Sequence, residues 1–120
     1  MFCYQCEQTA KGQGCTTKGV CGKDHDTATL QDLLVYALKG ISQYMHRAGK
    51  LGAHDHAIDV FTVEALFSTL TNVDFDPDRL VEYLGKAGGH RDRARALYED
   101  AAKKAGQKPE DLSGPAQFSL

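Results

Sequence analysis

Apolar residues recur at intervals of three and four along three stretches of the chain, which is the pattern of amphipathic helices. The first stretch begins near "DTATLQDLLVYALKGISQYMHRAGKLG". Thr29 followed by Asp32 fits a capping box at its start. Asp26 and Thr27 are alternative caps, and Gly52 stands where a terminating glycine belongs. The apolar side of this predicted helix consists of Leu30, Leu33, Leu34, Ala37, Leu38, Ile41, Tyr44, Met45, Ala48 and Leu51.

The second stretch, "DHAIDVFTVEALFSTLTNV", is richer in Phe, Val and Thr and is therefore a weaker helix former. Its length of about 18 residues without a turn signal is nevertheless too long for a typical strand. We predict a helix with Asp55 as its N-cap. The residues expected on its apolar face are Ile58, Phe61, Ala65, Leu66, Leu70 and Val73.

The third stretch is "DFDPDRLVEYLGKAGGHRDRARALYEDAAKKAG". Asp76 followed by Pro77 is the preferred arrangement of a cap and a first helical residue. The pair Gly88 and Gly89 is expected to break or kink this helix, and Gly106 is expected to end it. Its apolar side consists of Leu80, Val81, Leu84, Ala87, Ala94, Leu97, Tyr98, Ala101 and Ala105.

Short links between these stretches favour antiparallel neighbours, so we predict an all-α fold, a three-helix up-down-up bundle. Helices of about 22 residues would each be roughly 33 Å long. A chain of 120 residues has the typical length of a single domain. We divide it into a Cys-rich loop (1–24), the bundle (25–106) and a loop-like tail (107–120).

Composition narrows the class of protein. Apolar residues make up 42% of the chain and charged residues 25%, as in a folded, soluble protein. A formal net charge of −2 gives no attraction to nucleic acid or to an anionic membrane. There is no run of about 18 apolar residues and no signal-peptide pattern, so we expect a cytoplasmic protein without a membrane partner.

All four cysteines lie in the first 21 residues, as Cys3, Cys6, Cys15 and Cys21, with the spacing C-x2-C-x8-C-x5-C. Disulfides are rare in reducing compartments, and here they would only tie a terminal loop to itself. The four thiols are therefore predicted to bind a metal centre.

Four thiolates suit either a tetrahedral zinc ion or an iron–sulfur cluster. Structural zinc usually takes two pairs of closely spaced ligands, whereas the second pair here is separated by five residues. The larger cluster needs more chain between its ligands, so the spacing favours iron–sulfur and leaves zinc as the alternative. Glycines in the loop allow close backbone approach, and other loop residues could offset charge or exclude water. These residues are Gly12, Gly14, Gly19 and Gly22, the lysines Lys11, Lys18 and Lys23, and the apolar Phe2, Tyr4 and Val20.

"MFCYQCEQTAKGQGCTTKGVCGK" followed by "TATLQDLLVYALKGISQY" resembles the N-terminus of the hybrid cluster protein family, also called hydroxylamine reductase or prismane protein. The resemblance continues through "FTVEALFSTLTNVDFD" and covers about the first 105 residues. The cysteine spacing resembles the form that holds a [4Fe-4S] cubane, so the resemblance implies that Cys3, Cys6, Cys15 and Cys21 ligate its irons. The family's second centre, a hybrid iron–sulfur–oxygen cluster, is where hydroxylamine is reduced to ammonia and water.

The family's chains are several times longer, and their hybrid cluster takes its ligands from later domains. This chain has no fifth cysteine, so it is expected to relay electrons but to lack hydroxylamine reductase activity alone. A redox donor protein and the remaining domains of a larger enzyme are the implied partners. The alternatives are a structural zinc module on a helical bundle and a metal-free helical interaction domain.

Histidines offer weaker candidates. His54 and His56, with Asp55 and Asp59, suggest a second metal site, although histidines on such a loop are more often solvated. His25 lies near enough to the cysteines in sequence to donate a hydrogen bond to a cluster sulfur. His46 and His90 have no supporting constellation. Carboxylates such as Glu64, Glu82, Glu99 and Asp100 are interpreted as solvated helix faces without an acid–base pair.

Overall fold

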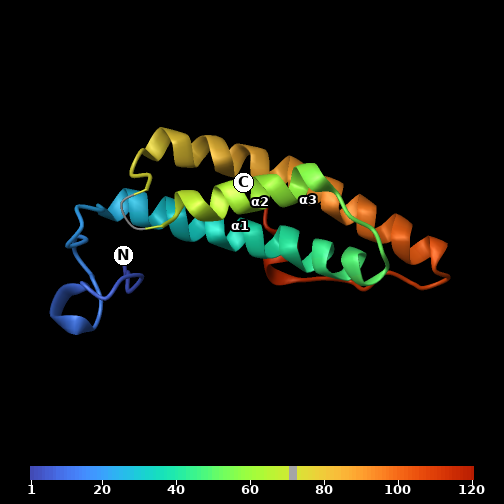
Figure 1. The fold of residues 1–120 in the computed structure, drawn as a ribbon, viewed down its shortest axis with the longest axis horizontal. Coiled ribbons are helices and arrows are strands. Elements are labelled where there is room, and N and C mark those ends of the chain that lie inside the picture. Colours follow the sequence, from blue (N-terminus) through green and yellow to red (C-terminus); the bar gives the residue numbers. More distant parts are fainter. Residues whose placement is uncertain (71–72) are drawn as a thin grey trace.

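The computed structural model describes residues 1–70 and 73–120, and in these residues it contains three α-helices (Figure 1). They are α1 (His25–Lys50), α2 (His56–Ser68) and α3 (Pro77–Lys104). The three helices run up, down and up along a molecule measuring 53 × 26 × 22 Å, with the cysteine-containing segment at one end (Figure 1). The predicted all-α three-helix bundle is confirmed.

The core is aliphatic and lies mainly between α1 and α3, against which α2 packs less extensively. Its fully buried side chains include Leu34, Ile41, Ile58 and Leu80, each 0% exposed. The inward faces of α1 and α3 follow the predicted stripes, apart from Val81, which is 54% exposed, and Ala105, which is exposed just after the end of α3. Burying these faces supplies the main stabilisation of the bundle. None of the helices in the described ranges is long and apolar enough to cross a membrane.

Asp24 caps α1, and its Oδ1 accepts a hydrogen bond from the Thr27 N–H at 2.8 Å. The predicted capping box of Thr29 with Asp32 is wrong, as are the alternative caps Asp26 and Thr27. Thr29 lies inside the helix, beyond its first turn, where its hydroxyl donates to the His25 carbonyl at 2.9 Å. A hydroxyl used in this way bonds to the helix's own backbone and cannot accept from the free N–H groups at its start.

The other helix boundary signals are confirmed. Asp55 accepts from the first N–H groups of α2, and Asp76 does so for α3. Gly52 and Gly106 follow α1 and α3 with φ angles of 80° and 71°. That left-handed conformation ends a helix and favours glycine over residues with a Cβ.

The helix lengths differ from the predicted 22 residues. α2 has only 13 residues, against 26 in α1 and 28 in α3. At its C-terminus the Ser68 and Thr69 hydroxyls donate to main-chain carbonyls of the last turn. The predicted second helix extended through Val73, but 71 and 72 lie outside the described residues. Leu66, Leu70 and Val73, expected in the core, are 44%, 45% and 43% exposed.

The pair Gly88 and Gly89 neither breaks nor ends α3, which continues to Lys104, so that prediction is wrong. Ala87 and Ala94 are buried on either side of the pair and hold both halves of the helix against the core. Packing on both sides outweighs the lower helix propensity of two glycines, which is roughly 1 kcal/mol each.

The segment 107–120 contains a short 3-10 helix, η2 (Gly114–Gln117), and lies along α1 (Figure 1). Gly40 allows this approach, because a Cβ at that position would lie 2.1 Å from the Pro115 carbonyl oxygen. Ala116 is 2% exposed, and the Phe118 ring meets Tyr36 edge-on at 5.5 Å between centroids. The C-terminal segment is thus packed onto the bundle at this crossing.

Candidate metal centre

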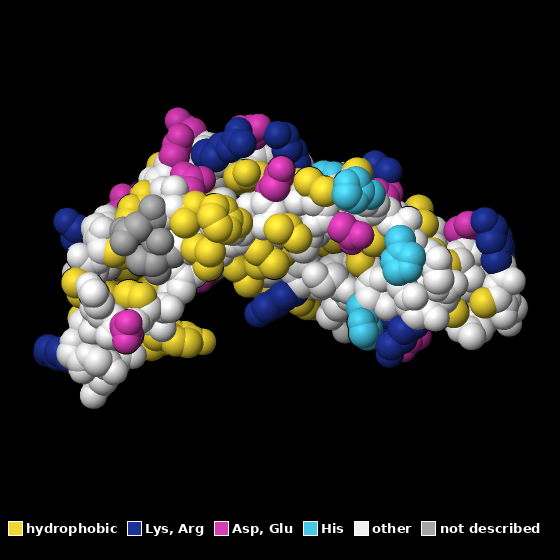
Figure 2. Space-filling view, in the orientation of Figure 1, with side chains coloured by type: hydrophobic (Ala, Val, Ile, Leu, Met, Phe, Trp, Pro, Cys, Tyr) yellow, Lys and Arg dark blue, Asp and Glu magenta, His cyan; other side chains and the backbone are white. Residues whose placement is uncertain are grey.

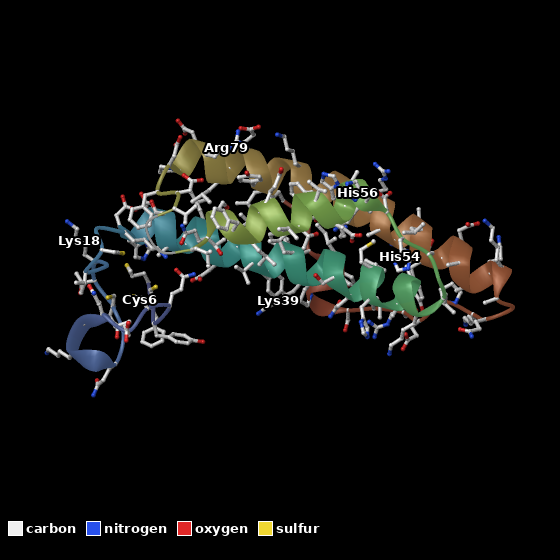
Figure 3. The ribbon with its side chains drawn as sticks, in the orientation of Figure 1. Cys6, Lys18, Lys39, His54, His56 and Arg79 are labelled. Atoms are coloured by element: carbon white, nitrogen blue, oxygen red, sulfur yellow. The ribbon has the colours of Figure 1, made fainter. Side chains whose placement is uncertain are left out.

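The four cysteines lie in the segment 1–24, which folds against the end of the bundle where α1 begins (Figure 1). All four thiols are free of disulfide bonds. Cys15 is buried, with 4% of its surface exposed, while Cys3, Cys6 and Cys21 are partly buried. Figure 3 shows Cys6 at this end of the molecule.

Cys3 and Cys15 are paired through their backbones, although they are 12 positions apart in the chain. The Cys3 N–H donates to the Cys15 carbonyl at 2.9 Å, and the Cys15 N–H donates to the Cys3 carbonyl at 2.7 Å. This isolated antiparallel bridge holds two of the predicted ligands on neighbouring strands of backbone. The side chains therefore start from nearby Cα atoms.

The Cys15 sulfur is surrounded by backbone donors. The Ala10 N–H lies 3.4 Å from Sγ, at the start of a short 3-10 helix, η1 (Ala10–Gly12). Hydrogen bonds from the Ala10 and Val20 N–H groups hold the pKa of the Cys15 thiol below its ordinary value, with a smaller contribution from the positive charge of Lys23. Because the thiolate is the metal-binding form, these donors favour a ligand at Cys15.

Gly19 makes room for the Cys21 sulfur. A Cβ on Gly19 would lie 3.2 Å from Cys21 Sγ and 3.0 Å from the Lys23 carbonyl oxygen. A tight turn follows, in which the Gly22 N–H donates to the Gly19 carbonyl at 2.9 Å. Gly22 has a φ of 97°, which residues with a Cβ rarely adopt. The two glycines thus fix the path of the chain on either side of Cys21.

The aromatic residues of the segment lie on its outside. The Phe2 ring covers Gly14 so closely that a Cβ there would lie 2.5 Å from the ring. Phe2 also packs on Tyr4, with ring centroids 5.4 Å apart. Phe2, Tyr4 and Val20, proposed from the sequence as shielding residues, are 54%, 72% and 62% exposed.

Of the three lysines in the segment, Lys23 alone is buried, being 3% exposed. Its ammonium nitrogen lies 3.9 Å from Cys3 Sγ and 5.9 Å from the centroid of the Phe75 ring. Lys11 and Lys18 are exposed. The sequence pattern does not distinguish these three lysines, whereas the fold places Lys23 beside Cys3.

Two glutamines that the sequence pattern alone does not identify join the segments at this end of the molecule. The Gln5 amide donates to the Thr69 carbonyl at 2.8 Å, joining the segment to the end of α2. The buried Gln31 amide of α1 donates to the Asp74 carbonyl at 2.9 Å. The signal for Gln31 in the sequence is its position: it is a polar residue three positions before Leu34, on an otherwise apolar helix face. A pocket of about 280 Å³ beside these bonds is lined partly by Cys3 and Lys23.

In the described part of the chain, no group of three or more His, Cys, Asp or Glu side chains is arranged so that it could hold a metal ion. The cysteine sulfurs therefore do not stand at the mutual spacing of ligands on one ion. Cysteines of a four-iron cluster each bind a different iron and are spaced more widely than ligands of a single zinc. The donor set itself fits such a cluster: four free thiols in one segment, backbone N–H groups at one sulfur and a buried cation at another.

His54 and His56 lie toward the opposite end of the bundle from Cys6 (Figure 3). Between them, Asp55 caps α2 and pairs with Arg93, whose Nε is 2.6 Å from its Oδ2. The carboxylate that was considered as a ligand is therefore occupied in structural contacts. Together with the absence of a suitable ligand group in the described residues, this leaves the suggested second metal site without support.

The remaining histidines have other surroundings. His25 lies 3.7 Å from Asp26, with 64% of its side chain exposed. His46 is exposed on α1, whereas His90 stacks on Phe61 with ring centroids 4.0 Å apart. Burial lowers the pKa of His90, and the positive charge of Arg93 lowers it further. His90 is thus favoured in its neutral form as a packing residue.

A sequence profile of the Prismane/CO dehydrogenase family matches residues 1–117. The chain belongs to this family. Among curated members, it is 53% identical over 116 residues to "Hydroxylamine reductase" of Rhodospirillum rubrum, covering 97% of this chain and 21% of that protein. It is 51% identical over 122 residues to the protein of the same name from Geobacter sulfurreducens, covering 100% of this chain and 22% of that protein.

These matches confirm the family resemblance drawn from the cysteine signature. They also show that the chain spans only about a fifth of the length of these curated family members. Proteins of the Prismane family bind iron–sulfur clusters.

Proposed function

We propose that this chain is an iron–sulfur electron-transfer module that binds a [4Fe-4S] cluster through Cys3, Cys6, Cys15 and Cys21. One observation carries the proposal: all four thiols of the chain are free and lie in one 24-residue segment at the head of the bundle. The identity of about half with hydroxylamine reductases over nearly the whole chain supports it. The [4Fe-4S] assignment rests on the family's cysteine spacing.

A bound cluster would supply one-electron oxidation and reduction without an open coordination position. The residues of this chain would hold it and set its surroundings. N–H groups of Ala10 and Val20 favour the thiolate of Cys15, and Lys23 places a positive charge beside Cys3. Donors and cations near sulfur are among the features that tune cluster potentials.

In a longer protein, we infer that the module passes electrons to a catalytic centre on other domains. Reduction of hydroxylamine to ammonia and water, the activity implied by the name of the two relatives, takes two electrons and two protons. The cluster would deliver these electrons singly from a redox donor protein in the reducing cytoplasm. The 120-residue chain alone is expected to show no turnover of hydroxylamine.

We propose the outward side of α2 as the contact surface for those other domains. Figure 2 shows apolar side chains gathered over this part of the molecule. Val63 and Phe67 on α2 are 67% and 60% exposed, and Leu66 between them is 44% exposed. A continuous apolar surface of this kind commonly marks an interface. The length of the relatives supports the remaining domains as its occupant.

The test is anaerobic production of the chain in iron-replete cells, followed by assays of iron, acid-labile sulfide and zinc. We expect iron and sulfide in the ratio of a [4Fe-4S] cluster, absorption at the blue end of the visible range and an EPR signal after reduction with dithionite. A colourless chain carrying one zinc ion would refute the proposal and support the structural zinc module. A chain that takes up neither metal would support a metal-free interaction domain.

A matched variant assigns the ligands. Cys6→Ser should lose the visible absorption, whereas Ser68→Cys, which adds a thiol on α2, should leave it unchanged. Retention of the complete cluster by Cys6→Ser would remove Cys6 from the ligand set. Each of the other three cysteines can be replaced in the same way.

A further inference from the structure

Lys23 is a buried cation in the cysteine segment 1–24, which has few buried residues. It is 3% exposed, and the other buried residues of 1–24 are Cys15 and Gly19. Its backbone is fixed because its carbonyl accepts the Gly19 N–H at 2.7 Å. The side chain extends from this anchored position to Cys3, with Nζ 3.9 Å from Sγ.

A buried ammonium group costs free energy unless an anion or hydrogen-bond acceptors compensate it. Among the residues that the structure describes, the Lys23 ammonium contacts the Cys3 sulfur and, at 5.9 Å, the face of the Phe75 ring. The ring provides a weak electrostatic attraction. A thiolate at Cys3 would provide a full negative charge, so the position of Lys23 suits an anionic centre built on Cys3.

We propose that Lys23 is a positioning residue that raises the reduction potential of the cluster, a role that rests on the proposed function. One-electron reduction adds one electron to the cluster, breaks no bond, and makes the cluster more negative by one charge. A fixed positive charge beside a ligand sulfur stabilises the reduced form more than the oxidised form. Because Lys23 is shielded from water, its charge is screened less than that of a surface lysine.

Lys18 supplies the matched control. It belongs to the same cysteine segment and carries the same charge, but it is exposed and extends outward at this end of the molecule (Figure 3). Neutralising Lys18 changes the net charge of the chain as much as neutralising Lys23 does. A comparison of the two therefore separates the position of the charge from the amount of charge.

The experiment is an anaerobic potentiometric titration of the reconstituted chain with dithionite and mediator dyes, monitored by EPR. Lys23→Met keeps the length and apolar stem of the side chain and removes its charge. We expect the reduced-to-oxidised ratio at a fixed potential to fall about tenfold, which is a shift of about 59 mV to more negative potential for one electron. Lys18→Met should shift the potential much less, and Lys23→Arg should stay near the unsubstituted chain.

Equal shifts in Lys23→Met and Lys18→Met would overturn the proposal, and so would equal shifts in Lys23→Met and Lys23→Arg. If Lys23→Met holds no cluster, Lys23→Gln is titrated in its place. Failure of both neutral variants to retain iron would also overturn it, because Lys23 would then be required for binding and not for the potential. If the unsubstituted chain binds no iron–sulfur cluster, the proposed function itself fails.

Discussion

The cysteine segment 1–24 and the helical bundle are held together by different interactions. The bundle buries aliphatic side chains such as Leu34, Ile41 and Leu80 between its helices. The buried residues of the segment are Cys15, Gly19 and Lys23, none of which is a large apolar side chain. The bundle can therefore be stabilised by apolar burial, whereas the segment has no core and depends on turns, a backbone bridge and, in our proposal, a bound cluster.

This difference predicts that the two regions respond to different changes. A loss of apolar contact should unfold the bundle and carry the segment with it, since the segment is attached to the ends of α1 and α2. A loss of a cysteine should remove metal binding and leave the helices intact. The four predictions below test this separation, from the largest expected effect on the stability of the bundle to the smallest.

Leu34→Ala should have the largest effect. Leu34 in α1 is 0% exposed, and truncation would leave a cavity between the helices. We expect the free energy of unfolding to fall by about 2–5 kcal/mol, measured by urea denaturation followed by far-UV circular dichroism. Leu120→Ala is the control, because Leu120 is 78% exposed. Similar losses in both variants would contradict the assigned core.

Gly40→Ala should displace the C-terminal segment from α1. The new Cβ would lie 2.1 Å from a main-chain oxygen of Pro115, which cannot move aside like a flexible side chain. We expect a loss of about 1–3 kcal/mol in the same denaturation experiment.

Gly85→Ala is the matched control for this change. Gly85 lies in α3, and a Cβ there would meet nothing within 4 Å. Its higher helix propensity should stabilise the chain by about 0.5–1 kcal/mol. The two glycine substitutions thus have opposite expected signs, and a gain in stability for Gly40→Ala would show that η2 does not pack on α1.

Asp24 should make the junction between the two regions sensitive to acid. The hydrogen bond from the Thr27 N–H lowers the pKa of Asp24 in the folded chain. The folded state therefore binds a proton less readily than the unfolded state, whose aspartate pKa is about 3.9. The stabilisation is fully present above that value and is lost as the pH falls toward the lower folded pKa.

Thermal denaturation between neutral and acidic pH measures this effect. Asp24→Asn keeps a capping oxygen but cannot titrate there, so its stability should fall less steeply below about pH 4. Asp26→Asn is the control, because the Asp26 side chain is 87% exposed and does not cap the helix. Identical acid profiles for Asp24→Asn and the unsubstituted chain would argue against this cap as a source of acid sensitivity.

Cys6→Ser should have the smallest effect on the bundle. In the metal-free chain we expect the free energy of unfolding to change by less than about 0.5 kcal/mol, as for most substitutions outside a core. The same variant should lose the iron bound by the unsubstituted chain. A large loss of stability without metal would show that the thiol segment supports the bundle directly.

The sequence predicted the bundle well because its signals are local and repeated. The apolar stripes of α1 and α3, the caps Asp55 and Asp76 and the glycines after both long helices needed no knowledge of distant contacts. The start of α1 was misassigned because several residues capable of capping occur close together between Asp24 and Thr29. Only the fold shows which of them has its side chain turned toward the free N–H groups.

The errors at α2 and α3 have a different origin. The apolar pattern of a sequence does not show whether a neighbouring helix covers a given residue. The exposed Leu66 and Leu70 therefore have the same signal in the sequence as the buried Ile58. Helix propensity alone predicts a break at Gly88 and Gly89, whereas tertiary packing keeps the helix continuous through this pair. The exposure of Leu66 and Leu70 and the continuity of α3 both depend on contacts between residues that are far apart in the sequence.

The cysteine signature pointed to a metal centre, but the sequence could not separate Lys23 from Lys11 and Lys18. Burial of one lysine depends on the turn from Gly19 to Lys23 and on the position of Phe75, which comes from the loop before α3. The same holds for Gln5 and Gln31, whose carbonyl partners lie 64 and 43 positions away. Their partners follow from the topology and not from spacing.

The backbone pairing of Cys3 with Cys15 has a consequence for the entropy of binding. Closing a chain segment into a ring costs conformational entropy, and here two main-chain hydrogen bonds already close the segment between these residues. If Cys3 and Cys15 hold a cluster as proposed, less conformational entropy would remain to be lost on binding than in an open segment.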